Sequence, residues 1–161
     1  MLTYKDIQNK ILPLKTLDRM FTASFRKKHQ IVFTNGCFDL LHRGHVYYLS
    51  RAREWGNLLV LGLNSDDSVT RLKGPGRPVN DQQARAEVLA GLVFVDYIVV
   101  FTEDTPLKLI STLRPDVLVK GGDYNVEEIV GYREVLSWGG RIETIPLLEG
   151  YSTSSIIEGG S

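Results

Sequence analysis

Residues 31–49 read IVFTNGCFDLLHRGHVYYL, and this stretch decides the fold. Its first three residues are apolar, and the run stops at Asn35-Gly36, which predicts a short buried strand that ends in a turn. Residues 43–55 then place apolar side chains at helical spacing. A buried strand that leads through a turn into a helix is the first unit of a layered α/β fold.

The same alternation of strand and helix continues along the chain. Further strands are predicted at 58–63, 97–101, 117–119 and 141–145. Helices are predicted at 66–72, 82–91, 106–113, 127–138 and 154–158, and within the first thirty residues. Several strands are apolar at every position, so both faces of the sheet must be covered. We therefore predict an α/β fold, a Rossmann-like doubly wound sheet of about five parallel strands with helices on both faces.

Length and composition limit the class of protein. The 161 residues suit one domain over 30–158, preceded by a helical extension over 1–29 and followed by a tail at 159–161. Lys and Arg number 19, as do Asp and Glu, which excludes an extended basic surface for nucleic acid or a membrane. A single cysteine and the lack of a long apolar run or signal peptide predict a cytoplasmic enzyme or small-ligand binder.

Two histidines mark a candidate phosphate site. His42 and His45 flank Gly44 at the start of a predicted helix, where backbone N–H groups are free and the glycine leaves room for a ligand. A metal site is the alternative, but it needs more ligands, while Cys37 lies in a different register and His29 is remote. A purely structural pair is the third interpretation, and two histidines around a glycine are unusual for a core.

The stretch FTNGCFDLLHRGH resembles the HxGH signature of the nucleotidyltransferase superfamily, in its cytidylyltransferase-like branch. Other stretches agree in order and spacing: LNSDDSV, RLKGPGRPVN, RAEVLAGLVFVDYIVVF, RPDVLVKGGDY and GYSTSSII. Together they resemble the adenylyltransferases of ADP-heptose synthesis in a stand-alone form without a kinase domain. The resemblance covers residues 30–158.

The resemblance implies roles for individual residues. His42, His45 and Lys73 are expected to be catalytic, with the histidines on the triphosphate and Lys73 on the heptose phosphate or the α-phosphate. Nucleotide contacts are expected from Thr34, Asn35, Gly36, Cys37, Phe38, Lys120, Gly122, Asp123, Ser152, Thr153 and Ser154. Substrate contacts are expected from Asp39, Asn64, Asp66, Arg77 and Arg85.

Two of these residues have alternative interpretations. Asp39 could instead orient a histidine or a metal-bound water, or simply bond within its own turn. Cys37 is better explained as a small loop residue than as a nucleophile, because no paired base is evident. No protein metal ligand is assigned, and Mg²⁺ is expected to arrive with ATP, held by phosphates and water.

The implied reaction is transfer of AMP from ATP to D-glycero-β-D-manno-heptose 1-phosphate, a step toward the lipopolysaccharide core. Other substrate pairs remain open, namely CTP with glycerol 3-phosphate or GTP with a heptose phosphate, as does a non-catalytic nucleotide sensor. Aminoacyl-tRNA synthetases share the two-histidine signature, but no KMSKS-like sequence is present. Members of this superfamily commonly form dimers, so a homo-oligomer is expected.

Overall fold

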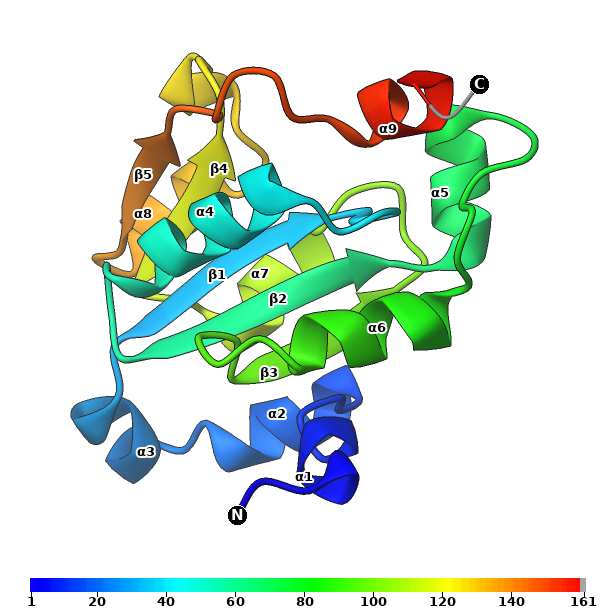
Figure 1. The fold of residues 1–161 in the computed structure, drawn as a ribbon. Coiled ribbons are helices and arrows are strands. Elements are labelled where there is room, and N and C mark those ends of the chain that lie inside the picture. The colour runs from blue at the N-terminus through cyan, green and yellow to red at the C-terminus, as the bar shows by residue number, and fades with distance from the viewer. Residues whose placement is uncertain (160–161) are drawn as a thin grey trace.

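Five strands form one sheet in which every neighbouring pair is parallel. They are β1 (Ile31–Gly36), β2 (Leu58–Asn64), β3 (Tyr97–Phe101), β4 (Val117–Gly121) and β5 (Arg141–Ile145). The computed structural model describes residues 1–159. The strand order is β3-β2-β1-β4-β5, as Figure 1 shows. The predicted parallel, doubly wound α/β fold is confirmed.

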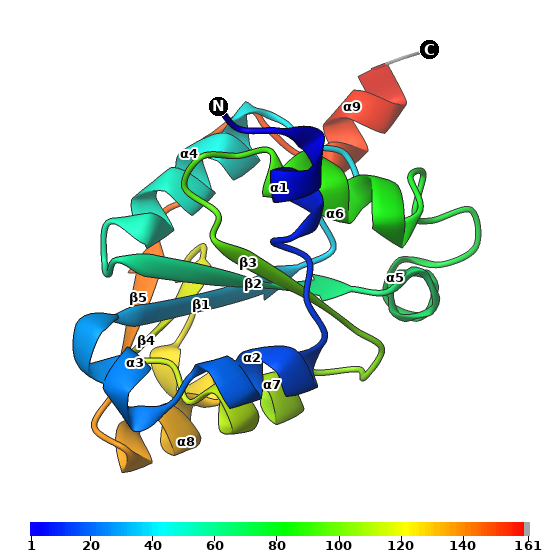
Figure 2. The same ribbon diagram turned by 90° about the horizontal axis from the view of Figure 1, so that it is seen from below.

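Helices cover both faces of the sheet. They are α1 (Tyr4–Gln8), α2 (Leu14–Met20), α3 (Ala23–Lys28), α4 (Arg43–Arg53), α5 (Asp66–Lys73), α6 (Gln82–Ala90), α7 (Leu107–Leu113), the 3₁₀ helix η1 (Val126–Glu128), α8 (Tyr132–Ser137) and α9 (Thr153–Gly159). Figure 2 shows α4 and α6 on one face, and α2, α7 and α8 on the other. None of the helices within residues 1–159 is long and apolar enough to cross a membrane.

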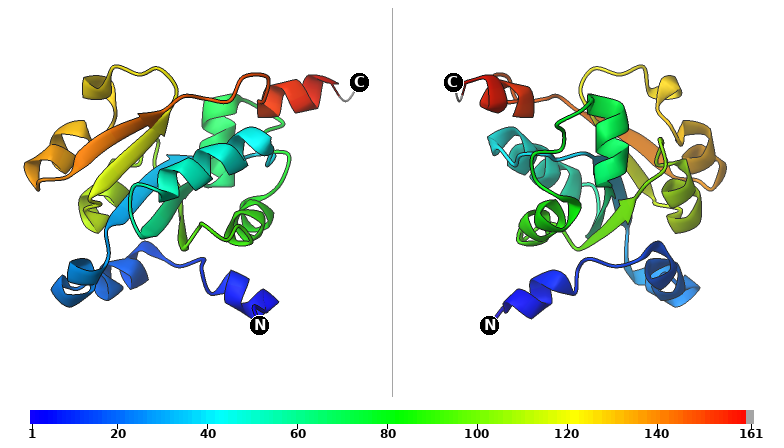
Figure 3. Two further views of the ribbon diagram at one scale, coloured as in Figure 1. Left: turned by 60° about the vertical axis from the view of Figure 1, so that its left-hand side comes forward. Right: turned by 90° about the vertical axis from the view of Figure 1, so that its right-hand side faces the viewer.

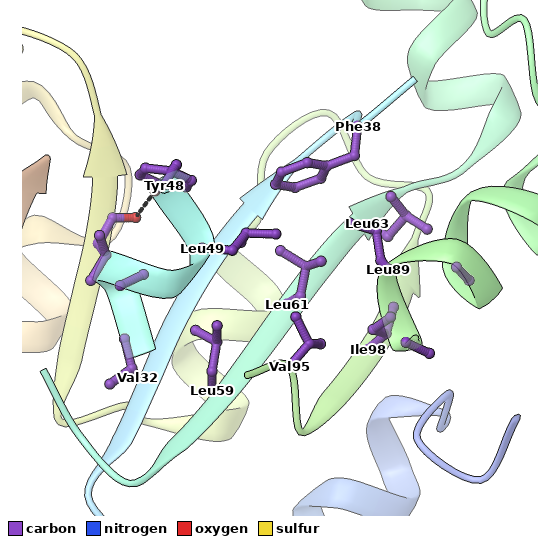
Figure 4. Close-up of a cluster of buried hydrophobic side chains, with 14 of the residues drawn as sticks. Val32, Phe38, Tyr48, Leu49, Leu59, Leu61, Leu63, Leu89, Val95 and Ile98 are labelled. Atoms are coloured by element: carbon purple, nitrogen blue, oxygen red, sulfur yellow. Dashed lines mark hydrogen bonds between the residues drawn. The ribbon is translucent and has the colours of Figure 1, made fainter. Parts of the chain in front are cut away.

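Alternation along the strands builds one hydrophobic cluster on each face. Leu59 and Leu61 of β2 pack with α4 and α6, while Leu58 and Val60 pack on the side of α7. The first cluster is drawn in Figure 4. Every residue of β2 is buried, because a strand covered by helices on both faces needs apolar side chains at successive positions.

The strand order reverses beside β1. The chain proceeds from β1 outward through β2 and β3, then crosses back to place β4 on the opposite side of β1. Connections therefore leave the carboxyl ends of β1 and β4 in opposite directions, and a crevice opens at that edge. Ligands of doubly wound sheets bind in such a crevice. The HxGH stretch lies at the same edge.

The N-terminal extension protects an edge of the sheet. Leu12 donates its backbone N–H to the carbonyl of Ile98 at 2.9 Å, and Ile98 donates to the carbonyl of Lys10 at 2.9 Å. The extension thus pairs with β3, whose outer backbone groups would otherwise be open to another chain. Leu17 is fully buried in the same cluster as Leu118 of β4, so the extension and the sheet share a core.

One predicted helix is wrong in extent. Residues 127–138 form η1 and α8 with a break between them, not a single helix. Ile129 turns into the core at 6% exposure, and Gly131 adopts a φ of 91° against Ile110. A left-handed glycine cannot continue an α-helix, so the chain restarts at Tyr132. Of the predicted tail at 159–161, Gly159 ends α9 and the other two residues lie outside the described part of the chain.

A glycine between α4 and β2 gives a test of this packing. A Cβ on Gly56 would lie 2.4 Å from the backbone carbonyl oxygen of Gln30, which cannot rotate away. We expect Gly56→Ala to lower the free energy of unfolding by about 1–3 kcal/mol, the scale of a forced backbone shift. Urea denaturation measures it. Gly159→Ala is the control, because a Cβ there meets nothing within 4 Å, and an equal loss in both variants would contradict the prediction.

Candidate active site

A cleft of about 620 Å³ lies at the carboxyl edge of the sheet. Its wall is built from the segments that follow β1, β2, β4 and β5, together with the start of α4. The segment after β5 crosses this edge and ends in α9, as the views in Figure 3 show. Most of the predicted site residues line the cleft: Asn35, Gly36, Cys37, Phe38, Asp39, His42, His45, Asn64, Lys73, Arg77, Lys120, Ser152, Thr153 and Ser154.

His42 and His45 stack on each other at the start of α4. Their ring centroids are 3.7 Å apart and their planes differ by 22°. Gly44 makes this stack possible, because a Cβ there would lie 2.9 Å from the His42 ring and 3.1 Å from Cβ of Tyr151. His42 is the N-cap residue and its side chain does not cap the helix, so the first turn of α4 keeps donors for an anion.

Both imidazoles are neutral near pH 7. Burial, with a smaller effect from His42, lowers the pKa of His45 to about 4. Burial also lowers the pKa of His42 below its ordinary value. Nδ1 of each ring is buried without a hydrogen-bond partner among residues 1–159. A neutral imidazole still carries one N–H donor, so the pair can bind phosphate oxygens without adding fixed positive charge.

Two lysines face the cleft in different environments. Lys73 ends α5 and is exposed. Lys120, on β4, donates from Nζ to Oδ1 of Asn35 at 2.6 Å, and burial lowers its pKa to about 8. Lys120 therefore links the ends of β4 and β1 across the reversal point, with its ammonium inside the cleft.

The C-terminal segment is attached to the HxGH loop. Thr153 donates from Oγ1 to the carbonyl of Leu40 at 3.3 Å, and the Arg43 guanidinium donates to the hydroxyl of Tyr151 at 3.0 Å. The Tyr151 ring lies 6.4 Å from that of His42. Oγ of Ser152 accepts from the backbone N–H of Ser155 at 3.0 Å. Residues 108 and 113 positions further along the chain thus bond to the HxGH loop and the start of α4.

The side chains of Thr34 and Arg85 are buried and lie outside the cleft wall. The Thr34 side chain is fully buried and its hydroxyl meets that of Tyr48 at 2.6 Å, and Tyr48 in turn donates to the Val119 carbonyl, the dashed line in Figure 4. Thr34 therefore joins β1, α4 and β4 beneath the cleft. It is not part of the cleft wall, and its predicted contact with the nucleotide is not supported.

Arg85 is buried at 2% exposure and its donors are used inside the protein. Nη1 donates to the carbonyls of Cys37 and Asn64 at 2.7 and 2.8 Å, and Nε donates to the carbonyl of Asn80 at 3.0 Å. Nη2 bonds Oδ1 of Asp66 at 2.8 Å. These hydrogen bonds connect the ends of β1 and β2 to the loop before α6 through the Arg85 side chain. Because all three guanidinium nitrogens are used in this way, a direct contact between Arg85 and substrate is not supported.

Gly122, Asp123 and Asp66 lie outside the cleft wall, and their predicted contacts stay untested. Cys37 lines the cleft, and burial raises the pKa of its thiol, which disfavours a nucleophilic thiolate.

One part of the cleft was not predicted from the sequence. It is an apolar wall formed by Tyr124, Leu147, Leu148 and Tyr151. The sequence carried a signal for this wall, since Tyr124 and Tyr151 belong to the KGGDY and GYSTSSII stretches and the two leucines precede the second one.

The cleft does not present a metal cage. Within residues 1–159 no group of three or more His, Cys, Asp or Glu side chains is arranged to hold an ion. The two cleft carboxylates are each paired, Asp39 with Arg77 at 2.6 Å and Asp104 with Arg71 at 3.0 Å. A divalent cation would therefore depend on ligands that the bound substrate supplies.

Comparison with known proteins agrees with this geometry. The family described as Cytidylyltransferase-like matches residues 33–159. Two curated relatives are each named bifunctional protein HldE. The one from Syntrophotalea carbinolica is 57% identical over 153 residues, and the one from Geobacter sulfurreducens is 56% identical over 149 residues. These alignments cover 95% and 92% of this chain but 31% and 30% of the relatives, so the chain spans about a third of their length.

Solved structures show the same fold. A lipopolysaccharide core biosynthesis protein from Thermoplasma volcanium superposes with a TM-score of 0.61 at 25% identity, covering 77% of this chain and 99% of that one. A pantoate-beta-alanine ligase from Francisella tularensis superposes with a TM-score of 0.59 at 14% identity, covering 91% and 75%. The second likeness concerns the fold alone.

The histidine pair predicts a pH dependence of stability. In the unfolded chain an imidazole takes up its proton near pH 6.5, whereas folded His45 does so only near pH 4. The unfolded state binds more protons in that interval, so we expect the free energy of unfolding to fall as the pH is lowered from 6.5 to 4. Denaturant unfolding at several pH values should show a shallower fall for His45→Asn. His29→Asn, outside the cleft, should keep the wild-type slope; equal slopes in all three proteins would refute the assignment.

Proposed function

Because the chain belongs to the cytidylyltransferase-like family and is a nucleotidyltransferase, we propose that it transfers AMP from ATP to D-glycero-β-D-manno-heptose 1-phosphate. The products are ADP-heptose and pyrophosphate. The observation that carries the proposal is the pair of stacked, neutral histidines in one cleft with Lys73, Lys120 and the hydroxyls of 152–154. The HldE relatives and the lipopolysaccharide core biosynthesis protein support the sugar assignment.

The reaction needs positioning and charge stabilisation more than covalent chemistry. A phosphate oxygen of the sugar 1-phosphate attacks the α-phosphorus of ATP and forms a new P–O bond. The bond from the α-phosphorus to the oxygen that bridges to the β-phosphate breaks, and pyrophosphate carries away the electron pair. The protein has to hold the two anions in line and stabilise the charge on the leaving oxygens.

The cleft offers donors for each part of the nucleotide. We assign His42 and His45 to the triphosphate, where their N–H donors meet the charge that develops on departure of pyrophosphate. Hydroxyls and backbone amides of 152–154 suit the β- and γ-phosphates. To the rest of the nucleotide we assign cleft-lining residues: Asn35, Gly36, Cys37 and Phe38 along its length, and the apolar wall of Tyr124 and Leu147 at the nucleoside.

We assign the acceptor phosphate to the side of the cleft formed by the loop after α5. Lys73 ends α5, Arg77 lies on this loop, and Asn64 ends strand β2. The amide of Asn64 suits a sugar hydroxyl, although it already donates to Oγ of Ser68 at 2.9 Å. Lys73 is exposed at the mouth of the cleft and can follow the phosphate as it approaches the nucleotide.

Mg²⁺ enters this proposal with the nucleotide. The phosphates and water supply its ligands, because the cleft carboxylates are paired with arginines. When bound, the ion neutralises charge on the triphosphate.

We also propose a cytoplasmic location, where ATP is available. We further propose a dimer, as the family resemblance implies, and sedimentation velocity tests the dimer.

The substrate assignment is tested with a panel of substrates. Pyrophosphate release is measured with ATP, CTP and GTP against heptose 1-phosphate and glycerol 3-phosphate, each with Mg²⁺. We expect turnover with ATP and the heptose 1-phosphate and at least tenfold lower kcat/KM with the other pairs. Preference for CTP with glycerol 3-phosphate would sink the heptose assignment. Nucleotide binding without turnover in any pair would favour a sensor.

The histidine assignment is tested by truncation. His42→Ala and His45→Ala each remove one preorganised donor, so we expect kcat to fall by roughly 10²–10³-fold. Circular dichroism and thermal unfolding check that the fold is retained. His29→Ala, which lies outside the cleft, is the matched control and should keep wild-type turnover. Near-normal kcat in both cleft variants would contradict the role.

A further inference from the structure

Asp39 carries a buried charge inside a cleft that is assigned to anions. The residue is 3% exposed, and a carboxylate in this position would repel a phosphate. It follows Phe38, whose φ of 44° turns the chain after β1. A buried carboxylate needs partners that compensate its charge, because an unpaired one is strongly unfavourable.

The loop between α5 and α6 supplies that reason. Oδ2 of Asp39 accepts from Nε of Arg77 at 2.6 Å, and Oδ1 accepts from the backbone N–H of Val79 at 2.7 Å and of Asn80 at 3.4 Å. Burial by itself raises the pKa of Asp39, but these hydrogen bonds outweigh it and hold the pKa below its usual value. The carboxylate is therefore ionised and fixes the loop.

Arg77 is held by one edge of its guanidinium. Nε is bound to Asp39, and the backbone carbonyl of Arg77 accepts from Oγ1 of Thr70 at 2.7 Å. Its Nη1 and Nη2 have no hydrogen-bond partner among residues 1–159, yet the residue lines the cleft. This contrasts with Arg85, whose Nε, Nη1 and Nη2 all bond protein atoms.

The free Nη1–Nη2 edge fits a phosphate. Two parallel N–H groups of a guanidinium bind two oxygens of one phosphate at once, which a lysine cannot do. A guanidinium whose Nε is already bonded loses less freedom when the phosphate arrives, so binding costs less entropy. The loop tip ahead of Arg77 is open, since a Cβ on Gly74 or Gly76 would meet nothing within 4 Å. The anchored part of this loop therefore begins at Arg77.

We propose that Asp39 is a positioning residue that holds Arg77 as a preformed receptor for the phosphate monoester of the acceptor substrate. This inference rests on the proposed function, because it needs a phosphate monoester to enter the cleft. The acceptor is favoured over the triphosphate since Arg77 lies on the loop that follows Lys73, whereas the groups assigned to the triphosphate come from α4 and the start of α9. Asp39 then contacts no substrate.

Steady-state kinetics of Asp39→Asn, Arg77→Gln and the double variant test the coupling. Losing a bidentate charged contact should raise the KM for the acceptor phosphate roughly 10- to 100-fold. We expect kcat and the KM for the nucleotide to change by less than about threefold. Asp39→Asn should raise the acceptor KM only when Arg77 is present, so the double variant should equal Arg77→Gln. Asp67→Asn, an exposed change of the same charge on α5, is the control.

Each other outcome has a definite meaning. Additive effects in the double variant would show that Asp39 does not act through Arg77. A raised KM for the nucleotide alone would assign Arg77 to the triphosphate and overturn the proposal. If Asp39→Asn does not fold, Arg77→Lys decides, because one ammonium cannot serve both anions and should raise the acceptor KM nearly as much as Arg77→Gln.

A binding measurement separates this inference from the proposed function. Titration with inorganic phosphate, followed by NMR of the Arg77 Nε–Hε signal, needs no turnover. We expect the signal to shift in the wild type and in Asp67→Asn, and to broaden or disappear from its position in Asp39→Asn. No shift in the wild type would overturn the receptor. Absence of turnover with every substrate pair, together with a phosphate shift, would overturn only the proposed function.

Discussion

The pairing of β1 on both of its sides is the constraint on which the rest of the structure depends. β1 is parallel to β2 on one side and to β4 on the other. Parallel neighbours need crossover connections, so all five strands end at one edge, and the connections from β1 and β4 leave it in opposite directions. The histidine pair, Lys120 and the loop after α5 converge on the gap that results.

The strands and the main site were predictable because both depend on local sequence. A strand that is buried on both faces appears in the sequence as an apolar run, as at Leu58–Asn64. The two histidines of the HxGH stretch are three residues apart, so their common location follows from the local sequence. The roles of Thr34 and Arg85 were not predictable, because polar residues beside a site read alike whether they meet a ligand or a distant backbone carbonyl. The break at Gly131 was not predictable either, because the positive φ of this glycine occurs where it packs against Ile110, a residue distant in sequence.

A zero net charge is compatible with the two polyanionic substrates proposed for this cleft, because the cleft offers hydrogen-bond donors with few uncompensated charges. Burial keeps the histidines neutral, and it lowers the pKa of Lys120 to about 8, which makes its charge easier to lose than that of an exposed lysine. Neutral N–H donors, hydroxyls and helix ends supply hydrogen bonds that a count of charges does not register.

The buried carboxylate of Asp39 weakens the attraction of the cleft for a phosphate, but it fixes the position of the Arg77 guanidinium. Asp39 cancels part of the charge of Arg77, so the pair attracts a phosphate less at long range than a free arginine would. In exchange the guanidinium is held through Nε, and Nη1 and Nη2 have no hydrogen-bond partner among residues 1–159. A guanidinium that is already held loses less freedom when the acceptor phosphate binds, so the gain in geometry appears as a lower KM for the acceptor and leaves kcat nearly unchanged.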